Sequence, residues 1–148
     1  MSLKGRIQTD MKEAMKAGDR DRLKVVRMLM AAVKQQEIDR RTELDDTAVL
    51  GVIEKMVKQR RDSIHQFKQG GRQDLADQEA AEIAVLETYL PEPLSASELE
   101  ALIDAAIAET GAASVRDMGK VMGQLKPQVQ GRADMGALGA AVKARLSD

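Results

Sequence analysis

Cysteine is absent from this chain of 148 residues, and its aromatic residues are one Phe and one Tyr, with no Trp. Without cysteine there can be neither a disulfide nor a catalytic thiolate, as is typical of a reducing compartment. The core must be built from aliphatic residues and the nine Met, which favours helices over sheets. Single-stranded RNA is usually read by stacking bases on aromatic rings, so the scarcity of aromatics argues against that class.

Long apolar runs are also absent. No stretch of 18 apolar residues occurs, and the first sixteen residues lack the apolar segment of a signal peptide. The 23 basic and 24 acidic residues leave a formal net charge of −1. The overall charge therefore favours neither nucleic acid nor an acidic ligand, and any electrostatic signal must be local. We expect a cytoplasmic protein that does not enter a membrane.

Residues 1–90 predict an N-terminal domain of about four helices. Apolar residues recur there at spacings of three and four, the period of amphipathic helices. The expected breaks are Gly18, the charged turn at 39–46 and the glycine pair at 70–71, and the last helix ends before Pro91.

Residues 95–148 predict a small tail domain of three helices. A capping box at Ser95 starts the first helix, Pro127 is expected to end the second, and Asp134 can cap the third. Residues 91–94 contain two prolines and are expected to form a hinge between the domains. The predicted fold class is all-α, with about four helices followed by a three-helix tail.

Residues suited to catalysis are scarce. His65 is the only histidine and hence the only obvious base near neutral pH, but a surface or half-buried position on a helix explains it well. No P-loop motif occurs, and no serine lies in a Gly/Ser-rich segment typical of amidases. We therefore expect no catalytic residue, no metal site and no cofactor.

A locally basic segment lies between residues 58 and 72, where five basic residues accompany a single acidic one. Such a surface could contact phosphates. The alternative is a solvated helix face whose basic residues pair with the acidic helix that follows. The candidate RNA-binding residues of this segment are Lys58, Arg61, Lys68 and Arg72.

The tail is divided by charge and contains a conspicuous pair of glycines. Residues 94–111 hold four acids and no base, whereas residues 112–148 hold six bases and three acids, so nucleic acid would be steered to the last two helices. Gly119 and Gly123 share one helix face. Each costs the helix about 1 kcal/mol relative to alanine, but lets another backbone approach closely.

Two backbones are candidates for this approach. One belongs to the last helix, which has glycines of its own at 136 and 139. The other is an RNA backbone, with charge supplied by the basic residues of this end of the chain. Under that interpretation the candidate RNA-binding residues are Gly119, Gly123, Lys120, Lys126, Arg132 and Lys143.

Three sequence elements occur in a specific order: FKQGGRQDLA, YLP, and MGKVM followed by GRAD. With them the chain resembles, over nearly its whole length, the YqeY family of small proteins. That family is related to the C-terminal tail of the B subunit of the tRNA-dependent Asp/Glu-tRNA amidotransferase. The resemblance implies an all-α, two-part fold with a basic surface that contacts RNA, as the amidotransferase tail is thought to contact tRNA. It also implies the label that such proteins often carry, glutamine-dependent carbon–nitrogen ligase.

Three functions follow from these observations. The favoured one is a non-catalytic tRNA-binding or tRNA-associated accessory module. The second is a subunit that supports amidotransferase activity together with partner chains, such as amidotransferase or tRNA synthetase proteins. The third is a helical protein-interaction module that does not bind RNA. The first is favoured because the sequence shows neither a nucleophile with its base nor a phosphate cradle.

Overall fold

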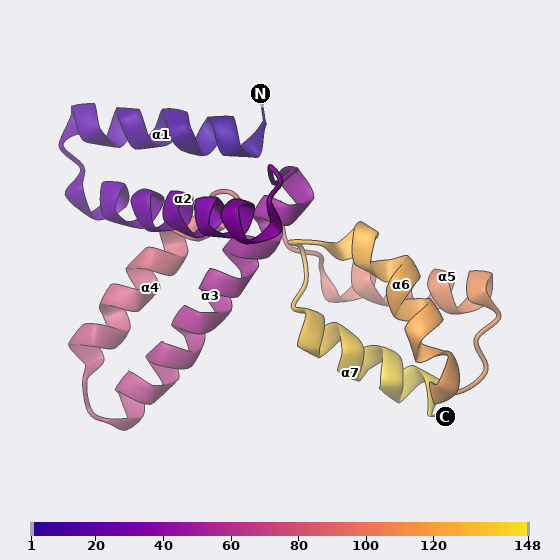
Figure 1. Ribbon diagram of the computed structural model, residues 1–148. Coiled ribbons are helices and arrows are strands. Elements are labelled where there is room, and N and C mark those ends of the chain that lie inside the picture. The colour runs from indigo at the N-terminus through magenta and orange to yellow at the C-terminus, as the bar shows by residue number, and fades with distance from the viewer. Residues whose placement is uncertain (1, 148) are drawn as a thin grey trace. The chain divides into compact units, whose positions relative to one another are not determined.

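The computed structural model describes residues 2–147, which form seven α-helices and one short 3-10 helix and contain no strand (Figure 1). The chain divides into two compact units, Met1–Leu90 and Pro91–Asp148. The first unit holds four helices and the second holds three, so the predicted fold class is confirmed. None of the helices in residues 2–147 is long and apolar enough to cross a membrane.

The first unit is built from two helical hairpins. In Figure 1 the first two helices run side by side, and the next two form a second hairpin. Gly18 closes the first turn with a left-handed backbone (φ 70°), which glycine adopts without strain. The helices of this unit are α1 (Leu3–Ala17), α2 (Arg20–Arg40), α3 (Asp46–Gln69) and α4 (Gln73–Glu87).

The core of the first unit is aliphatic, as the composition predicts. It includes Leu29, Ile53 and Leu86, which are fully buried. The buried Tyr89 follows α4 and donates a hydrogen bond from its hydroxyl to Asp10 of α1 at 2.7 Å. Burial, with a smaller effect of the Asp10 carboxylate, raises the pKa of Tyr89 to about 12. This contact ties the end of the unit to its first helix.

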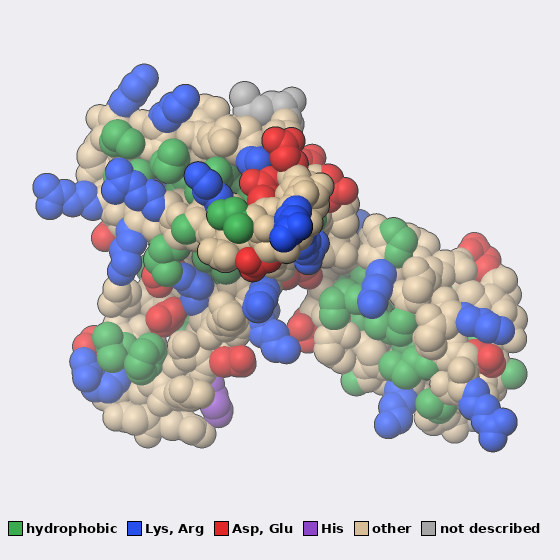
Figure 2. All heavy atoms as spheres, viewed as in Figure 1, with side chains coloured by type: hydrophobic (Ala, Val, Ile, Leu, Met, Phe, Trp, Pro, Cys, Tyr) green, Lys and Arg blue, Asp and Glu red, His purple; other side chains and the backbone are tan. Residues whose placement is uncertain are grey.

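The second unit packs α5 and α7 against the central helix α6, and its core is again aliphatic. The capping box at Ser95 is confirmed, since the Ser95 hydroxyl accepts from the Glu98 amide and the Glu98 carboxylate accepts from the Ser95 amide. Both units carry Lys and Arg side chains on their surfaces (Figure 2). The elements of this unit are α5 (Ala96–Thr110), η1 (Val115–Asp117), α6 (Met118–Val129) and α7 (Met135–Leu146).

Pro127 does not end its helix, so the prediction made from its position was wrong. It lies inside the last turn of α6, which continues to Val129. Proline there removes one amide donor, the one that would reach the Gly123 carbonyl four residues earlier. The side chain of Val129 is fully buried in the tail core, and this burial favours continuing the helix for two residues after Pro127.

Residues 91–94 are hydrogen-bonded to the rest of the tail. The Leu94 amide donates to the Arg132 carbonyl, and the Arg132 guanidinium donates through Nε to the Glu92 carbonyl, both at 2.9 Å. The segment is thus an ordered start of the second unit. That it acts as a hinge stays a prediction.

Candidate nucleic-acid interface

The solvent-facing side of α6 is the first candidate surface. Val121, Leu125 and Val129 point into the tail core, whereas Gly119 and Gly123 are exposed. At both glycines the space where a side chain would begin is open, with no described atom of another part of the chain within 4 Å. The glycines therefore form a smooth, uncovered stretch of backbone.

The neighbouring helix α7 does not use this surface. A side chain at its Gly139 would meet Met118 at 3.6 Å, an ordinary contact, and one at Gly136 would meet only the Asp134 carboxylate at 3.4 Å. The structure thus gives no support to the interpretation that the glycines of α6 allow a close approach of α7. The helix-weakening effect of Gly119 and Gly123 has no counterpart in packing within the described residues.

Lys120 and Lys126 flank the open glycines. Both are exposed, and neither forms an ion pair within residues 2–147. Because Pro127 has no amide proton, the helix offers the carbonyl of Gly123 no donor four residues on. We call the combination of Gly119, Lys120, Gly123 and Lys126 the α6 face. This face combines helix backbone that a ligand can approach closely with the positive charges of two lysines.

Arg132 differs from these two lysines because its side chain contacts other residues of the tail. Its guanidinium holds the Glu92 carbonyl and lies 3.9 Å from the Glu98 carboxylate. Its carbonyl accepts from Leu94. Lys143 on α7 is exposed and forms no ion pair among the described residues. Of the basic candidates in the tail, the lysines are thus available for a ligand, and Arg132 is largely engaged.

The basic segment 58–72, which runs from α3 to the N-cap of α4, is partly neutralised by carboxylates of α4. Arg61 lies 3.6 Å from Glu87, and Arg72 forms two 3.1 Å hydrogen bonds to Asp74. The bonds from Arg72 hold the pKa of the Asp74 carboxyl below its usual range. Lys58 and Lys68 are exposed and form no ion pair among the described residues. These contacts favour the interpretation of this segment as a solvated helix face that pairs with the acidic helix.

Arg60 is buried, a feature that the sequence analysis missed. Only 7% of the residue is exposed, and its Nε faces the carboxylates of Glu79 and Glu82 at 3.9 and 3.7 Å without a hydrogen bond. One terminal nitrogen donates to the Met56 carbonyl at 3.3 Å. A signal was available, because Arg60 is in helical phase with the apolar Ile53. The guanidinium is a charged link between α3 and α4.

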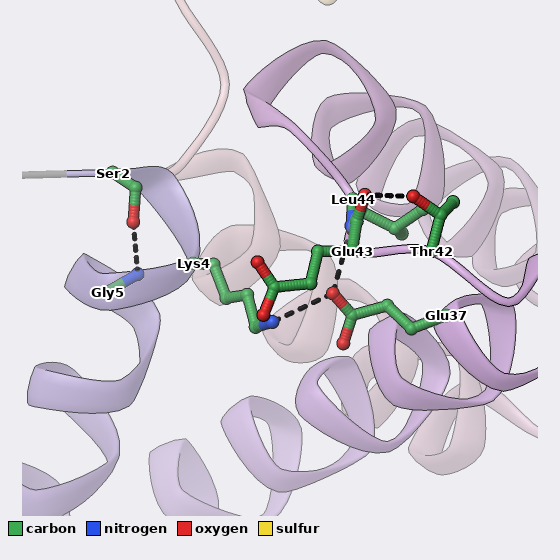
Figure 3. A network of polar contacts seen from close by, with 7 residues as sticks. All are labelled: Ser2, Lys4, Gly5, Glu37, Thr42, Glu43 and Leu44. Carbon is green, nitrogen blue, oxygen red and sulfur yellow. Dashed lines mark hydrogen bonds and ion pairs between the residues drawn. The ribbon is translucent and has the colours of Figure 1, made fainter.

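A polar network joins the start of α1 to the turn between α2 and α3 (Figure 3). The Lys4 ammonium and the Leu44 amide both donate to one oxygen of Glu37, at 2.8 and 2.9 Å. The bond from Lys4, and then that from Leu44, lowers the pKa of Glu37, and Glu37 in turn raises the pKa of Lys4. The network also includes the Ser2 hydroxyl, which accepts from the Gly5 amide and caps α1.

This network predicts a loss of stability in acid. A carboxyl whose pKa is lowered by folding stabilises the fold above its unfolded pKa, near 4.5, and this contribution disappears as pH falls through the lower folded value. In thermal melts, the Tm of Glu37→Gln should therefore fall less between pH 6 and pH 3 than the Tm of the parent chain. Glu13→Gln, at an exposed position on α1, is the control and should follow the parent. Identical pH profiles for all three proteins would contradict the prediction.

The residues that bear on catalysis are the candidate metal ligands and the single histidine. No three His, Asp or Glu side chains in residues 2–147 could hold a metal ion. His65 is exposed on α3, with its Nε2 3.1 Å from the side-chain nitrogen of Gln69. The geometry defines a two-unit helical protein with exposed Lys and Arg side chains on both units.

The chain belongs to the YqeY family, because residues 4–146 match the family described as Yqey-like protein. Several curated relatives share the name Altered inheritance of mitochondria protein 41, mitochondrial. The relative from Eremothecium gossypii is 39% identical over 106 residues, which cover 70% of this chain and 58% of the relative. That from Lachancea thermotolerans is 37% identical over 102 residues (68% and 54%). That from Pyrenophora tritici-repentis is 30% identical over 130 residues (86% and 71%).

The chain spans a little more than half the length of the relatives from Eremothecium gossypii and Lachancea thermotolerans. The expectation of a cytoplasmic protein is contradicted by the relatives, since each carries the word mitochondrial in its name. That expectation was based on the lack of a signal peptide and of a long apolar run. Neither feature distinguishes the cytoplasm from the interior of an organelle, which explains the error.

Proposed function

We propose that this chain binds folded RNA, specifically tRNA, through the α6 face. The observation that carries the proposal is the pair of uncovered glycines, Gly119 and Gly123, on a helix that also exposes Lys120 and Lys126. Lys120 interacts electrostatically with Asp117, but no carboxylate among the described residues lies within 4 Å of either lysine. Phosphate groups supply most of the affinity of proteins for nucleic acids. Ammonium groups at the edges of a smooth backbone can contact phosphates on a chain that lies directly against the helix.

Two further features support RNA as the ligand. The Gly123 carbonyl, which lacks the amide donor four residues on because of Pro127, can accept a hydrogen bond from a ribose 2′-hydroxyl, the group that distinguishes RNA from DNA. The tail contains no aromatic residue, which fits recognition of a folded RNA by shape and phosphates. The relationship of the family to an amidotransferase tail is the reason to name tRNA. Partner proteins of this module would then be those that charge or modify tRNA, namely synthetases and amidotransferases.

The test removes the two charges of the α6 face. At 0.15 M salt we expect the Lys120→Ala/Lys126→Ala variant of the full chain to bind tRNA about fivefold more weakly for each lost phosphate contact. The slope of log K against log salt should fall by roughly 0.7 to 0.9 per contact. Fluorescence anisotropy with labelled tRNA at four or more salt concentrations measures both quantities. Circular dichroism should show an unchanged fold, because exposed lysines rarely affect stability by more than about 0.5 kcal/mol.

A matched control separates a local contact from the loss of total charge. Lys12→Ala/Lys55→Ala also removes two exposed lysines, one from α1 and one from α3. This control should retain most of the parent affinity. If both double variants lower the affinity and the salt slope equally, the α6 face is not the site. If the parent does not bind tRNA even at 50 mM salt, the proposed function is wrong.

A further inference from the structure

The exposed side of α2 carries a line of basic residues that the sequence analysis did not identify. The members follow one another at helical spacings of four, three and seven residues, and all are exposed. Ala31 occupies the one position between the last two members, and no acidic residue interrupts the line. We call this set the α2 basic line: Arg20, Lys24, Arg27 and Lys34.

None of these four side chains is engaged in an ion pair among the residues that the structure describes. The α3 segment differs in this respect, because Arg60, Arg61 and Arg72 all face carboxylates. In Figure 2, Lys and Arg side chains are prominent over α1 and α2. Within the unit, Lys34 interacts electrostatically with Glu37, and Lys24 lines a pocket together with Glu79 and Glu82. The line is therefore balanced by weaker interactions than the arginines of residues 58–72, which lie within 4 Å of carboxylates.

The line is fixed to a rigid support. On the opposite side of α2, Val26, Leu29 and Val33 are fully buried in the core of the first unit. From Arg20 to Lys34 the helix rises about 21 Å at 1.5 Å per residue. Four positive charges are thus held along one side of the helix, at spacings of four, three and seven residues. An extended polyanion with regularly spaced charges complements such an arrangement.

We propose that the α2 basic line is a second phosphate-binding surface, which contacts the backbone of a double-stranded segment of a folded RNA. The inference rests on the proposed RNA binding and adds a site in the other unit. A membrane surface fits less well, because an interfacial helix inserts a row of large apolar side chains. Of the large apolar side chains on α2 only Met28 and Ile38 are exposed, whereas Val25, Val26, Leu29 and Val33 are buried. A protein partner fits less well too, because the line lacks the aromatic anchors that dominate such interfaces.

The experiment uses the full chain with the substitutions Lys24→Gln, Arg27→Gln and Lys34→Gln combined. The control combines Lys12→Gln, Arg40→Gln and Lys55→Gln, which remove the same charge from exposed positions on three helices. The probes are tRNA, a blunt 16-base-pair RNA duplex, and vesicles that contain phosphatidylserine. We expect the α2 variant to bind both RNAs at least tenfold more weakly than the control at 0.15 M salt. Its salt slope should be lower by about 2 to 3.

The outcomes separate this inference from the proposed function. If the α2 variant binds both RNAs like the control while Lys120→Ala/Lys126→Ala weakens tRNA binding, the α2 line is refuted and the α6 face stands. If the α2 variant lowers RNA binding and Lys120→Ala/Lys126→Ala does not, the α2 line stands and the α6 face fails. If the α2 substitutions reduce binding to vesicles but not to RNA, the line is a membrane contact and the inference is overturned.

Discussion

Arg60→Ala is expected to lower the free energy of unfolding of the first unit by about 3 kcal/mol. Removing one partner of a buried ion pair typically costs about 3 to 5 kcal/mol, and the lower end applies because Glu79 and Glu82 retain some contact with water. The substitution leaves the carboxylates of Glu79 and Glu82, both on α4, without the positive charge of Arg60. For a unit of about ninety residues this corresponds to a Tm lower by about 12 to 24 °C. Urea titration followed by circular dichroism measures the change in the free energy of unfolding, and a thermal melt measures the change in Tm.

The next residue in the chain provides the control. Arg61 also pairs with a glutamate of α4, Glu87 at 3.6 Å, but both side chains are more than half exposed. Exposed pairs contribute only about 0 to 1 kcal/mol, so Arg61→Ala should stay within about 1 kcal/mol of the parent. Equal losses for the two variants would show that Arg60 is not the buried link between α3 and α4.

The helices could be predicted from the sequence because their signals are local. The apolar periodicity, the capping box at Ser95 and the left-handed glycine at Gly111 each depend on residues within one or two turns. The same applies to the Asp134 cap of α7, whose carboxylate accepts from the Ala137 amide at 2.9 Å. Pro127 was misjudged because the burial of Val129, a tertiary effect, competes with the local preference.

The details of the surfaces depend on contacts that are distant in sequence. Arg132 reaches the Glu92 carbonyl forty residues away, and Arg60 meets carboxylates of the following helix. Basic residues that look equivalent in the sequence thus divide into engaged and available ones only when the helices are placed. The open space around Gly119 and Gly123 is of the same kind, because periodicity gives the face of a glycine but not what covers it.

That open space leads to a prediction in which stability and binding change in opposite directions. Gly123 is in the middle of α6, where glycine is about 1 kcal/mol less favourable than alanine or leucine, and no described atom obstructs a side chain there. Gly123→Leu should therefore raise the free energy of unfolding of the tail by up to about 1 kcal/mol. The same side chain would separate an RNA backbone from the helix by several ångströms, so tRNA binding should fall at least tenfold.

The control adds the same bulk to another helix of the tail. Ala105 is exposed on α5, whose acidic residues make it a poor surface for RNA, so Ala105→Leu should leave the affinity for tRNA unchanged. Thermal melts and anisotropy titrations of both variants at one salt concentration give the two quantities. A protein stabilised by Gly123→Leu that binds tRNA like the parent would show that nothing approaches this backbone, and the α6 face would lose its support. A protein destabilised by Gly123→Leu would instead show that the glycine is needed for packing, because an uncovered helix position gains stability from leucine.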